Sequence, residues 1–370
     1  MALLRPSLAS LATIWLILVS NLISSTAAAN YPLTNDSRCD CYMTNGSDTA
    51  NFTRHAFFDF RELEQYQGTP ALLGGFQEAS TAMTTSDFFL SEQWASMWEI
   101  QTWTNIGTAN TTMRRVNSRN NVYIEQNTDE RPSSKTWLSL RTARQADFQS
   151  TAEIVSRNKT YQYISMRMLA RTVGSPGGCT AMFTYHADDQ NRVQEVDLEV
   201  LTKYPKDQVQ CTNQPALDAN GDLIPEATAN VTLPNGLHWT DWAVYRLDWT
   251  PKQSTWYVNG EQLTNISFQT PHEASRIHLN AWSDAGNWTG KMDVNTEAHL
   301  QVQWWEILFN STSPDMQRQS CRRLCSVDET PVTGQPVKIS QGSRLVNRSA
   351  TLGTLVNWIP GLVVLALLVV

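Results

Sequence analysis

The chain has 370 residues, of which 41% are hydrophobic and 17% charged, and its formal net charge is −7. This length and hydrophobic content suit one large β domain or two smaller ones. Nucleic-acid binding is disfavoured, because such surfaces carry a basic patch or stripe and this sequence shows none. Tryptophan is abundant, with 14 residues. Because Trp is usually buried or placed at binding surfaces, we expect most of them in a core and a few on a binding surface.

Residues 1–29 are predicted to form a secretory signal peptide. Arg5 is the only basic residue there, Leu11 to Ile23 is apolar, and Ala27 to Ala29 supplies small residues for cleavage. An uncleaved membrane anchor is the alternative, and the cleavage site argues against it. The signal peptide predicts an extracellular protein.

Sequons of the form Asn-x-Ser/Thr follow the signal peptide. Each one alone is a weak signal, but ten of them behind a signal peptide are typical of a heavily glycosylated extracellular protein. Their asparagines are Asn35, Asn45, Asn51, Asn110, Asn158, Asn230, Asn265, Asn287, Asn310 and Asn347.

Six cysteines agree with an oxidising compartment, and no spacing of Cys with His resembles a zinc site. We predict that Cys179 and Cys211 bond to each other, one on each side of a central acidic stretch. The remaining four cysteines lie near the two ends of the predicted domain. Since the termini of a domain often lie close together, we predict that Cys39 and Cys41 pair with Cys321 and Cys325 in some order.

Short segments with β-strand character dominate the middle of the chain. Turn residues separate them, and Asn259-Gly260 is a strong hairpin signal. This pattern predicts an all-β fold, a single two-sheet antiparallel sandwich or jelly roll over residues 30–312 with a core from about 50 to 312. The segments are 122–125, 136–140, 161–169, 181–185, 194–200, 242–249, 254–258, 276–282 and 300–309.

The acidic stretch is Gln194 to Val200, in which three acids alternate with three aliphatic residues. This is the period-two pattern of a strand with one apolar face, so Glu195, Asp197 and Glu199 should project together from the other face. Two carboxyl groups on one cleft are what a retaining glycosidase requires. Three like charges resist simultaneous ionisation, so one acid should keep its proton near neutral pH. An ordinary strand with an acidic solvent face is the alternative.

The chain becomes polar and loses its periodicity after the last strand. Residues 313–349 are predicted to be a tether, and residues 350–370 are an almost wholly apolar C-terminal stretch. Small residues between Ser340 and Ser349 precede that stretch, which is the layout of a lipid-anchor signal. A single transmembrane helix is the alternative, because about 20 apolar residues span a bilayer.

These motifs together resemble one known family. The stretch Glu195 to Glu199 resembles the Glu-x-Asp-x-Glu catalytic strand of glycoside hydrolase family 16, which includes β-glucanases and fungal cell-wall transglycosylases. The residues Trp242 to Gly260 resemble its tryptophan-rich hairpin, and Leu279 to Trp288 resemble its Leu-Asn-x-Trp stretch. The resemblance covers residues 120–310 and points to a fungal-type, cell-surface member. Ala243 stands where many members carry a histidine, which leaves the substrate open.

The resemblance implies a concanavalin A-like sandwich and assigns roles to the three acids. Glu195 would be the nucleophile, Glu199 the general acid/base, and Asp197 the residue that hydrogen-bonds the nucleophile and tunes its charge. Candidates for substrate binding are Trp282 and Trp288, with core packing as the alternative. His186 is a further candidate for lining the cleft, and a surface or packed histidine is the alternative there.

The sequence therefore predicts an extracellular retaining glycosidase or transglycosylase. We expect it to act on β-glucan or chitin-type wall polysaccharide at the cell surface or in the cell wall. A non-catalytic, lectin-like carbohydrate-binding protein on the same sandwich is the competing hypothesis. The expected partners are a polysaccharide and, through a C-terminal lipid anchor, the membrane. We expect a monomer, with no nucleic acid, metal or cofactor.

Overall fold

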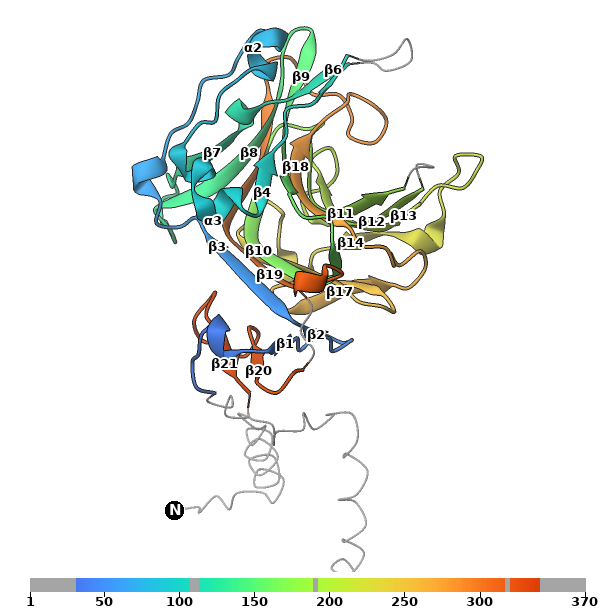
Figure 1. The fold of residues 1–370 in the computed structure, drawn as a ribbon. Helices are drawn as coiled ribbons and strands as arrows, with labels where there is room; N and C mark the ends of the chain where they lie inside the picture. Colours follow the sequence, from blue (N-terminus) through green and yellow to red (C-terminus); the bar gives the residue numbers. More distant parts are fainter. Residues whose placement is uncertain (1–30, 107–112, 189–191, 317–319, 340–370) are drawn as a thin grey trace, which may run out of the picture.

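The computed structural model describes residues 31–106, 113–188, 192–316 and 320–339, and most of them lie in or between β-strands (Figure 1). The predicted signal peptide, the predicted hydrophobic tail and the small residues of the expected anchor site lie outside the described residues. Within the described ranges, no helix is long and apolar enough to cross a membrane.

Seven antiparallel strands form the sheet that carries the three acids, which we call the acid-bearing sheet. The acidic strand β12 lies between β11 and β13, so the acids have a strand on either side. In spatial order the strands are β4 (Trp98–Ile100), β9 (Phe148–Ser156), β18 (Arg276–Trp282), β11 (Cys179–Ala187), β12 (Val193–Leu201), β13 (Gln208–Gln214) and β14 (Thr228–Thr232).

The second sheet, which we call the outer sheet, is built around the two longest strands, β10 and β19, paired antiparallel along most of their length. Strand β9 belongs to both sheets, since its first residues pair with β8 and β6 and its last residues with β18 and β4. The strands are β17 (Glu261–Ile266), β16 (Ser254–Val258), β15 (Ala243–Trp249), β10 (Tyr161–Gly174), β19 (Glu297–Ser311), β3 (Arg54–Asp59), β8 (Thr136–Arg144), β7 (Val122–Gln126), β6 (Arg114–Asn117) and β5 (Thr104–Asn105). The predicted all-β jelly-roll sandwich is thus confirmed.

The hydrophobic core fills the space between these sheets. Val196, Leu198 and Val200 of β12 enter it and are at most 4% exposed. From the outer sheet, Trp256 packs into the same core, and its indole nitrogen donates a hydrogen bond of 2.8 Å to the backbone oxygen of Asp197. The core therefore fixes the acidic strand both by its apolar side chains and by its backbone.

The hairpin from β16 to β17 turns at Asn259-Gly260, as predicted. Both residues have positive φ, 47° and 81°, which is the combination required by a type I′ turn. Asparagine and glycine are the residues that adopt this backbone conformation most readily.

Helical structure is short and lies mostly between β3 and β7. The α-helices of the described residues are α2 (Phe76–Ser80) and α3 (Glu92–Ala95), and Trp94 of α3 is buried in the core. The 3-10 turns are η1 (Asp36–Arg38), η2 (Glu64–Tyr66), η3 (Asp87–Leu90), η4 (Arg119–Asn121), η5 (Pro225–Ala227), η6 (Pro234–Gly236) and η7 (Pro314–Met316).

The two ends of the described chain meet in a small terminal sheet below the sandwich (Figure 1). It consists of β2 (Asn51–Phe52), β1 (Cys41–Met43), β20 (Leu324–Ser326) and β21 (Val337–Lys338), with β1 and β20 parallel. Disulfides join Cys39 to Cys325 and Cys41 to Cys321. This confirms the predicted pairing of the end cysteines.

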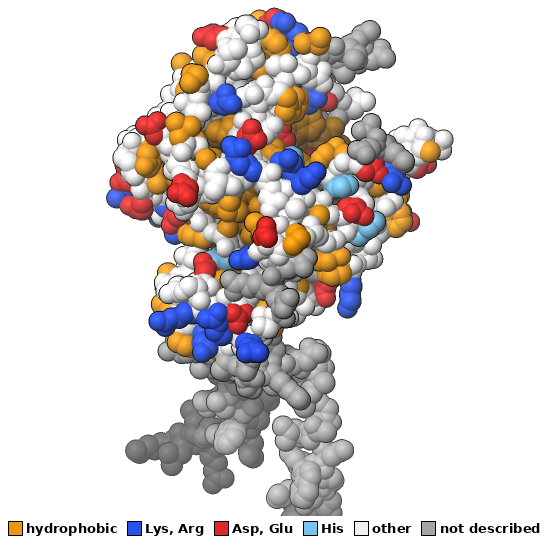
Figure 2. Space-filling model, viewed as in Figure 1, with side chains coloured by type: hydrophobic (Ala, Val, Ile, Leu, Met, Phe, Trp, Pro, Cys, Tyr) orange, Lys and Arg blue, Asp and Glu red, His pale blue; other side chains and the backbone are white. Residues whose placement is uncertain are grey.

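The terminal sheet also corrects the predicted tether at 313–349. Residues 324–338 contain two strands of that sheet instead of an unstructured connection. The disulfides and backbone pairing to β1 supply the order that the polar composition of this stretch did not indicate. Exposed basic side chains gather over the terminal sheet (Figure 2); its segments contribute Arg38, Arg322, Arg323 and Lys338.

One acid fastens the terminal sheet to the sandwich. The side chain of Asp328, 4% exposed, forms ion pairs with Arg167 of β10 and Arg246 of β15. Burial acts to raise the pKa of Asp328, but the two guanidinium groups outweigh it and hold the pKa below its usual value. At the same junction between the terminal sheet and the sandwich, His55 of β3 lies between Asp36 at 2.8 Å and Glu306 at 3.0 Å.

Candidate active site

The alternation of β12 separates its side chains as the sequence predicts. Glu195, Asp197 and Glu199 lie on the face opposite the core, which we call the acid-bearing face. Their side chains are partly or fully buried. Asp197 is 3% exposed and Glu199 9%, while Glu195 is partly buried.

Asp197 is the most confined of the three acids. Burial, followed by the charges of Glu195 and Glu199, raises its pKa well above the usual value. Side-chain hydrogen bonds join it to Glu195 and to Gln214, and its Oδ2 atom is buried without a hydrogen-bond partner among the described residues. These effects favour the protonated form of Asp197, which donates the hydrogen bond to Glu195.

Glu195 is the acid that receives this hydrogen bond. Burial raises its pKa, the hydrogen bond from Asp197 lowers it, and the charges of Glu199 and Glu153 raise it again, to about 7. The bond from Asp197 favours the carboxylate form, because it donates to the charged oxygen. Glu195 thus has a hydrogen-bond donor that favours its ionised state.

Glu199 is held by two donors on a single oxygen. Its Oε1 atom accepts hydrogen bonds of 3.3 Å from the indole nitrogen of Trp288 and of 3.3 Å from the thiol of Cys179. Burial raises the pKa of Glu199, and the bonds from Cys179 and Trp288 lower it in part. Burial and the nearby carboxylates raise the pKa of Cys179 well above its usual value, so the thiol stays protonated and remains a donor.

The predicted disulfide between Cys179 and Cys211 is wrong, because both thiols are free. Cys179 of β11 pairs with Leu201 of β12, whereas Cys211 of β13 pairs with Leu198 on the other side of that strand. The two cysteines are therefore two strands apart and on opposite faces of the sheet. Cys211 is part of the hydrophobic core, and Cys179 contacts Glu199.

The three predicted substrate-binding residues take different positions. Trp282 of β18 pairs with Cys179 and so lies on the acid-bearing face, partly exposed. Trp288 is 38% exposed and contacts Glu199 directly. His186 lines a hollow on the Glu195 side of this face, where its Nδ1 atom is 2.9 Å from the backbone oxygen of Ala274.

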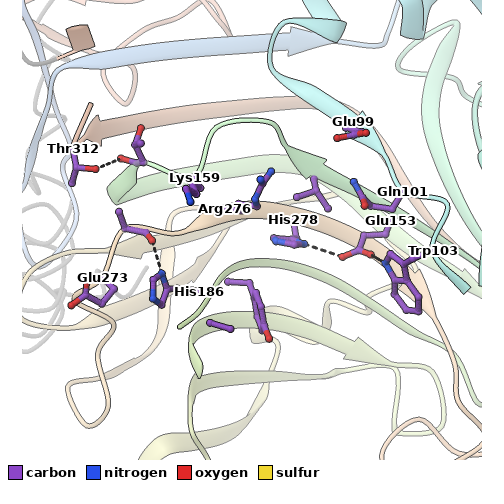
Figure 3. A pocket seen from close by; sticks show the side chains of 15 residues that line it. Glu99, Gln101, Trp103, Glu153, Lys159, His186, Glu273, Arg276, His278 and Thr312 are labelled. Carbon is purple, nitrogen blue, oxygen red and sulfur yellow. Dashed lines mark hydrogen bonds and ion pairs between the residues drawn. The ribbon is translucent and has the colours of Figure 1, made fainter. Parts of the chain in front are cut away.

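Two hollows lie on the acid-bearing face, on the side of β11, β18, β9 and β4, and their lining residues do not include the three acids. The larger has a volume of about 690 Å³ and the smaller about 150 Å³, and they share Trp103 and Glu153. Arg276, Lys159 and His186 surround the larger one (Figure 3). The larger volume is in the usual range for a small-molecule site, roughly 300–1,000 Å³.

Glu153 organises the floor of these hollows. Its carboxylate accepts a hydrogen bond of 2.8 Å from the indole of Trp103 and lies 2.9 Å from Nδ1 of His278 (Figure 3). It also accepts a hydrogen bond of 2.9 Å from the side-chain amide of Asn117. At the smaller hollow, the guanidinium of Arg115 lies over both the Trp103 ring, at 5.8 Å, and the Trp282 ring, at 5.5 Å.

Sequence reasoning did not single out Trp103, although 45% of it is exposed at the rim of both hollows. It lies in a tryptophan-rich stretch before the part of the chain that resembles a known family, so no motif marked it. Exposure of a tryptophan cannot be read from local sequence. In the described part of the chain, no group of three His, Cys, Asp or Glu residues is arranged to hold a metal ion.

Comparison with known proteins identifies a family whose profile matches this chain. The profile described as glycosyl hydrolases family 16 matches residues 110–305. A xylanase/beta-glucanase of Ruminococcus flavefaciens is 22% identical over 268 residues, which is 68% of this chain and 31% of that protein. A beta-glucanase of Bacillus licheniformis is 24% identical over 149 residues, 40% of this chain and 58% of the other. The chain thus spans less than two thirds of the length of these curated relatives.

Two solved structures are similar to part of this chain. The Bacillus licheniformis beta-glucanase has a TM-score of 0.45 and 21% identity, covering 57% of this chain and 92% of that one. The laminarinase catalytic domain of Thermotoga maritima has a TM-score of 0.44 and 14% identity, covering 59% and 92%.

Proposed function

The chain belongs to the glycosyl hydrolases family 16, and from this premise we propose that it is a retaining β-glucan glycosidase or transglycosylase of the cell surface. The observation that carries the proposal is the set of three acids on β12, with a donor for Glu195 and two donors for Glu199. The relatives described as beta-glucanases favour β-glucan as the substrate. Chitin-type polysaccharide is the second substrate to test.

The proposed reaction has two steps. The Glu195 carboxylate attacks the anomeric carbon, the bond to the leaving oxygen breaks, and Glu199 gives that oxygen its proton. Glu199 then removes a proton from water or from a sugar hydroxyl, whose oxygen attacks the anomeric carbon and frees Glu195. Asp197 stays protonated throughout and hydrogen-bonds Glu195 while it is charged.

Unpaired polar atoms support a bound sugar on this face. Among the described residues, Nε2 of His278, Oδ1 of Asn280 and Oδ2 of Asp197 are buried without a hydrogen-bond partner. Buried polar atoms nearly always have a partner, and the hydroxyl groups of a sugar are suitable ones. Trp103 and Trp282 offer aromatic surfaces beside them for a sugar ring.

The proposal also includes transglycosylation and attachment to the cell surface. The form of the acidic strand with one residue between Asp197 and Glu199 resembles that of family transglycosylases, which favours a sugar acceptor. The sequons, the N-terminal apolar segment and the C-terminal apolar tail favour an extracellular, glycolipid-anchored protein. Treatment of cells with a phosphatidylinositol-specific phospholipase should release it.

The test is product analysis with defined oligosaccharides. Purified wild-type protein should convert β-glucan oligosaccharides into longer products if it transfers and shorter ones if it hydrolyses. Glu195→Gln should lose at least about a thousandfold in kcat/KM, because it removes the nucleophile. Glu199→Gln should lose activity on natural linkages but keep the first step on substrates with good leaving groups, which need little proton assistance.

Glu92→Gln, at an exposed acid of α3, is the matched control and should behave as wild type. Wild-type turnover by Glu195→Gln would remove β12 from the chemistry. Binding of oligosaccharides without any product, in the wild-type protein, would indicate the lectin-like alternative.

A further inference from the structure

Eight of the ten sequons lie within the described residues, and one of them stands apart by its position. Asn230 is an exposed residue of β14 and is followed by exposed Thr232. Asn110 and Asn347 lie outside the described residues. The proposed function gives Asn230 no role.

Strand pairing places Asn230 in register with Glu199, the proposed acid/base. Asn230 of β14 is opposite Gln210 of β13, and Gln210 is opposite Glu199 of β12. Adjacent strands are about 4.8 Å apart, so the backbone of Asn230 lies roughly 10 Å from that of Glu199 across the sheet.

The flanking residues fix the direction of the Asn230 side chain. Ala229 and Val231 pack against the hydrophobic core. Side chains alternate along a strand, so Asn230 and Thr232 point to the opposite side, which is the acid-bearing face. This second observation agrees with the register and does not depend on it.

Strand β14 is also the edge of its sheet. Among the described residues its ladder partner is β13, and β17 of the outer sheet lies close to β14, while Asn230 itself is exposed. An N-linked glycan is large and hydrophilic, and a covering of this kind also protects an exposed strand edge from pairing with other chains.

We propose that Asn230 carries an N-linked glycan that closes the acid-bearing face beyond β13. A polysaccharide would then extend from the acids toward β11, β18, β9 and β4, where the two hollows lie, and would find space for few sugar units on the other side. The inference rests on the proposed function and on the proposed extracellular location. It makes the glycan a determinant of where along a polymer the chain is cut or joined.

The experiment uses the full chain secreted from a eukaryotic host. Mass spectrometry of the peptide containing Asn230, after enzymatic deglycosylation, measures occupancy. Asn230→Gln and Thr232→Ala remove the same sequon through different residues, whereas Thr232→Ser keeps it. Asn265→Gln removes a sequon from the outer sheet, where Asn265 is exposed opposite Thr255.

The readout is the cleavage pattern on an end-labelled ladder of β-glucan oligosaccharides. Asn230→Gln and Thr232→Ala should raise kcat/KM for long relative to short oligosaccharides by at least about threefold and shift the cut site. Thr232→Ser and Asn265→Gln should match the wild type. Tryptophan fluorescence titration with the same ladder measures binding without turnover and should show the same gain.

The outcomes separate the two proposals. An unoccupied Asn230, or an occupied one whose removal changes neither cut site nor binding, overturns the inference and leaves the proposed function. A change in Asn230→Gln alone assigns the effect to the amide and also overturns it. Length-dependent binding gains in both sequon variants, without turnover in any variant, support the inference and overturn the proposed enzyme. A wild-type chain that neither cuts nor binds overturns both.

Discussion

Two hydrogen-bond donors on one oxygen of Glu199 influence the pKa of this proposed acid/base. The thiol of Cys179 and the indole of Trp288 both favour the ionised form of this acid, against the burial that raises its pKa. The activity should follow a bell-shaped pH profile, with an acid limb near pH 7 from Glu195, whose pKa is about 7. The alkaline limb then reports the loss of the proton from Glu199.

Replacing Cys179 with Ala should move that alkaline limb to higher pH. The variant loses a donor that lowers the pKa of Glu199, so the acid keeps its proton to a higher pH. We expect a shift of roughly half a pH unit to one unit in kcat/KM, since a thiol is a weak donor.

Cys179→Ser keeps a donor and is the matched control, with its alkaline limb near that of the wild type or below it. A profile of Cys179→Ala that overlays the wild type, in a protein with unchanged thermal unfolding, would show that the thiol has no influence on Glu199.

The candidate site illustrates what residue patterns can and cannot predict. The three acids and their common face follow from a local alternation in seven residues, and so they could be predicted. The contact of Cys179 with Glu199 depends on which strand lies beside β12, and the exposure of Trp103 depends on the packing of β4 and β9. Neither depends on neighbours in sequence.

At the scale of elements, the strand order explains the remaining errors. The strands and the β16–β17 hairpin were predictable, because apolar alternation and turn residues are local signals. The prediction of a disulfide between Cys179 and Cys211 was wrong because it assumed that cysteines flanking a strand in sequence also meet in space. Strand β12 instead separates them, and the pleat points them to opposite faces. The strands β20 and β21 are too short to give a periodic signal.

Asp328 is the element-scale contact with the clearest energetic consequence. Replacing it with Ala should destabilise the protein by about 1–3 kcal/mol, because the buried Arg167 and Arg246 would lose their shared acid but keep Glu306 and Asp248 as ion-pair partners. Denaturant unfolding measures this loss. Asp315→Ala, at an exposed acid of η7, should change stability by less than about 0.5 kcal/mol. Equal effects of the two substitutions would mean that the buried ion pairs do not hold the terminal sheet.

For the whole molecule, protonation of His55 makes the stability of the junction between the terminal sheet and the sandwich depend on pH. Burial acts to lower its pKa, but the hydrogen bonds with Asp36 and Glu306 and the charges of these acids outweigh burial and raise the pKa to about 9. A folded-state pKa above the usual 6.5 means that protonation stabilises the folded protein. This contribution is complete below pH 6.5 and is lost as the pH rises through about 9.

The free energy of unfolding should therefore fall between pH 6.5 and 9, and the terminal sheet should lose protection from hydrogen exchange first. Denaturant unfolding at a series of pH values, with hydrogen exchange of β1 and β20, measures both effects. His55→Gln should be less stable than wild type at pH 6, and its stability should fall less steeply than that of wild type across this window, with the remaining slope coming from Glu195 and Asp197, whose pKa values are raised. A wild-type protein whose stability is constant there would contradict this role for His55.

The two crosslinks between the ends of the described chain have a consequence for proteolytic damage. Both join residues near position 40 to residues beyond position 320. A protease that cuts once anywhere between Cys41 and Cys321 leaves one crosslink partner on each fragment, so the fragments stay covalently joined. The segment around Leu217 and Leu223, both more than half exposed, is a place where such a cut can occur. A nicked molecule would migrate as one species on a non-reducing gel and as two after reduction.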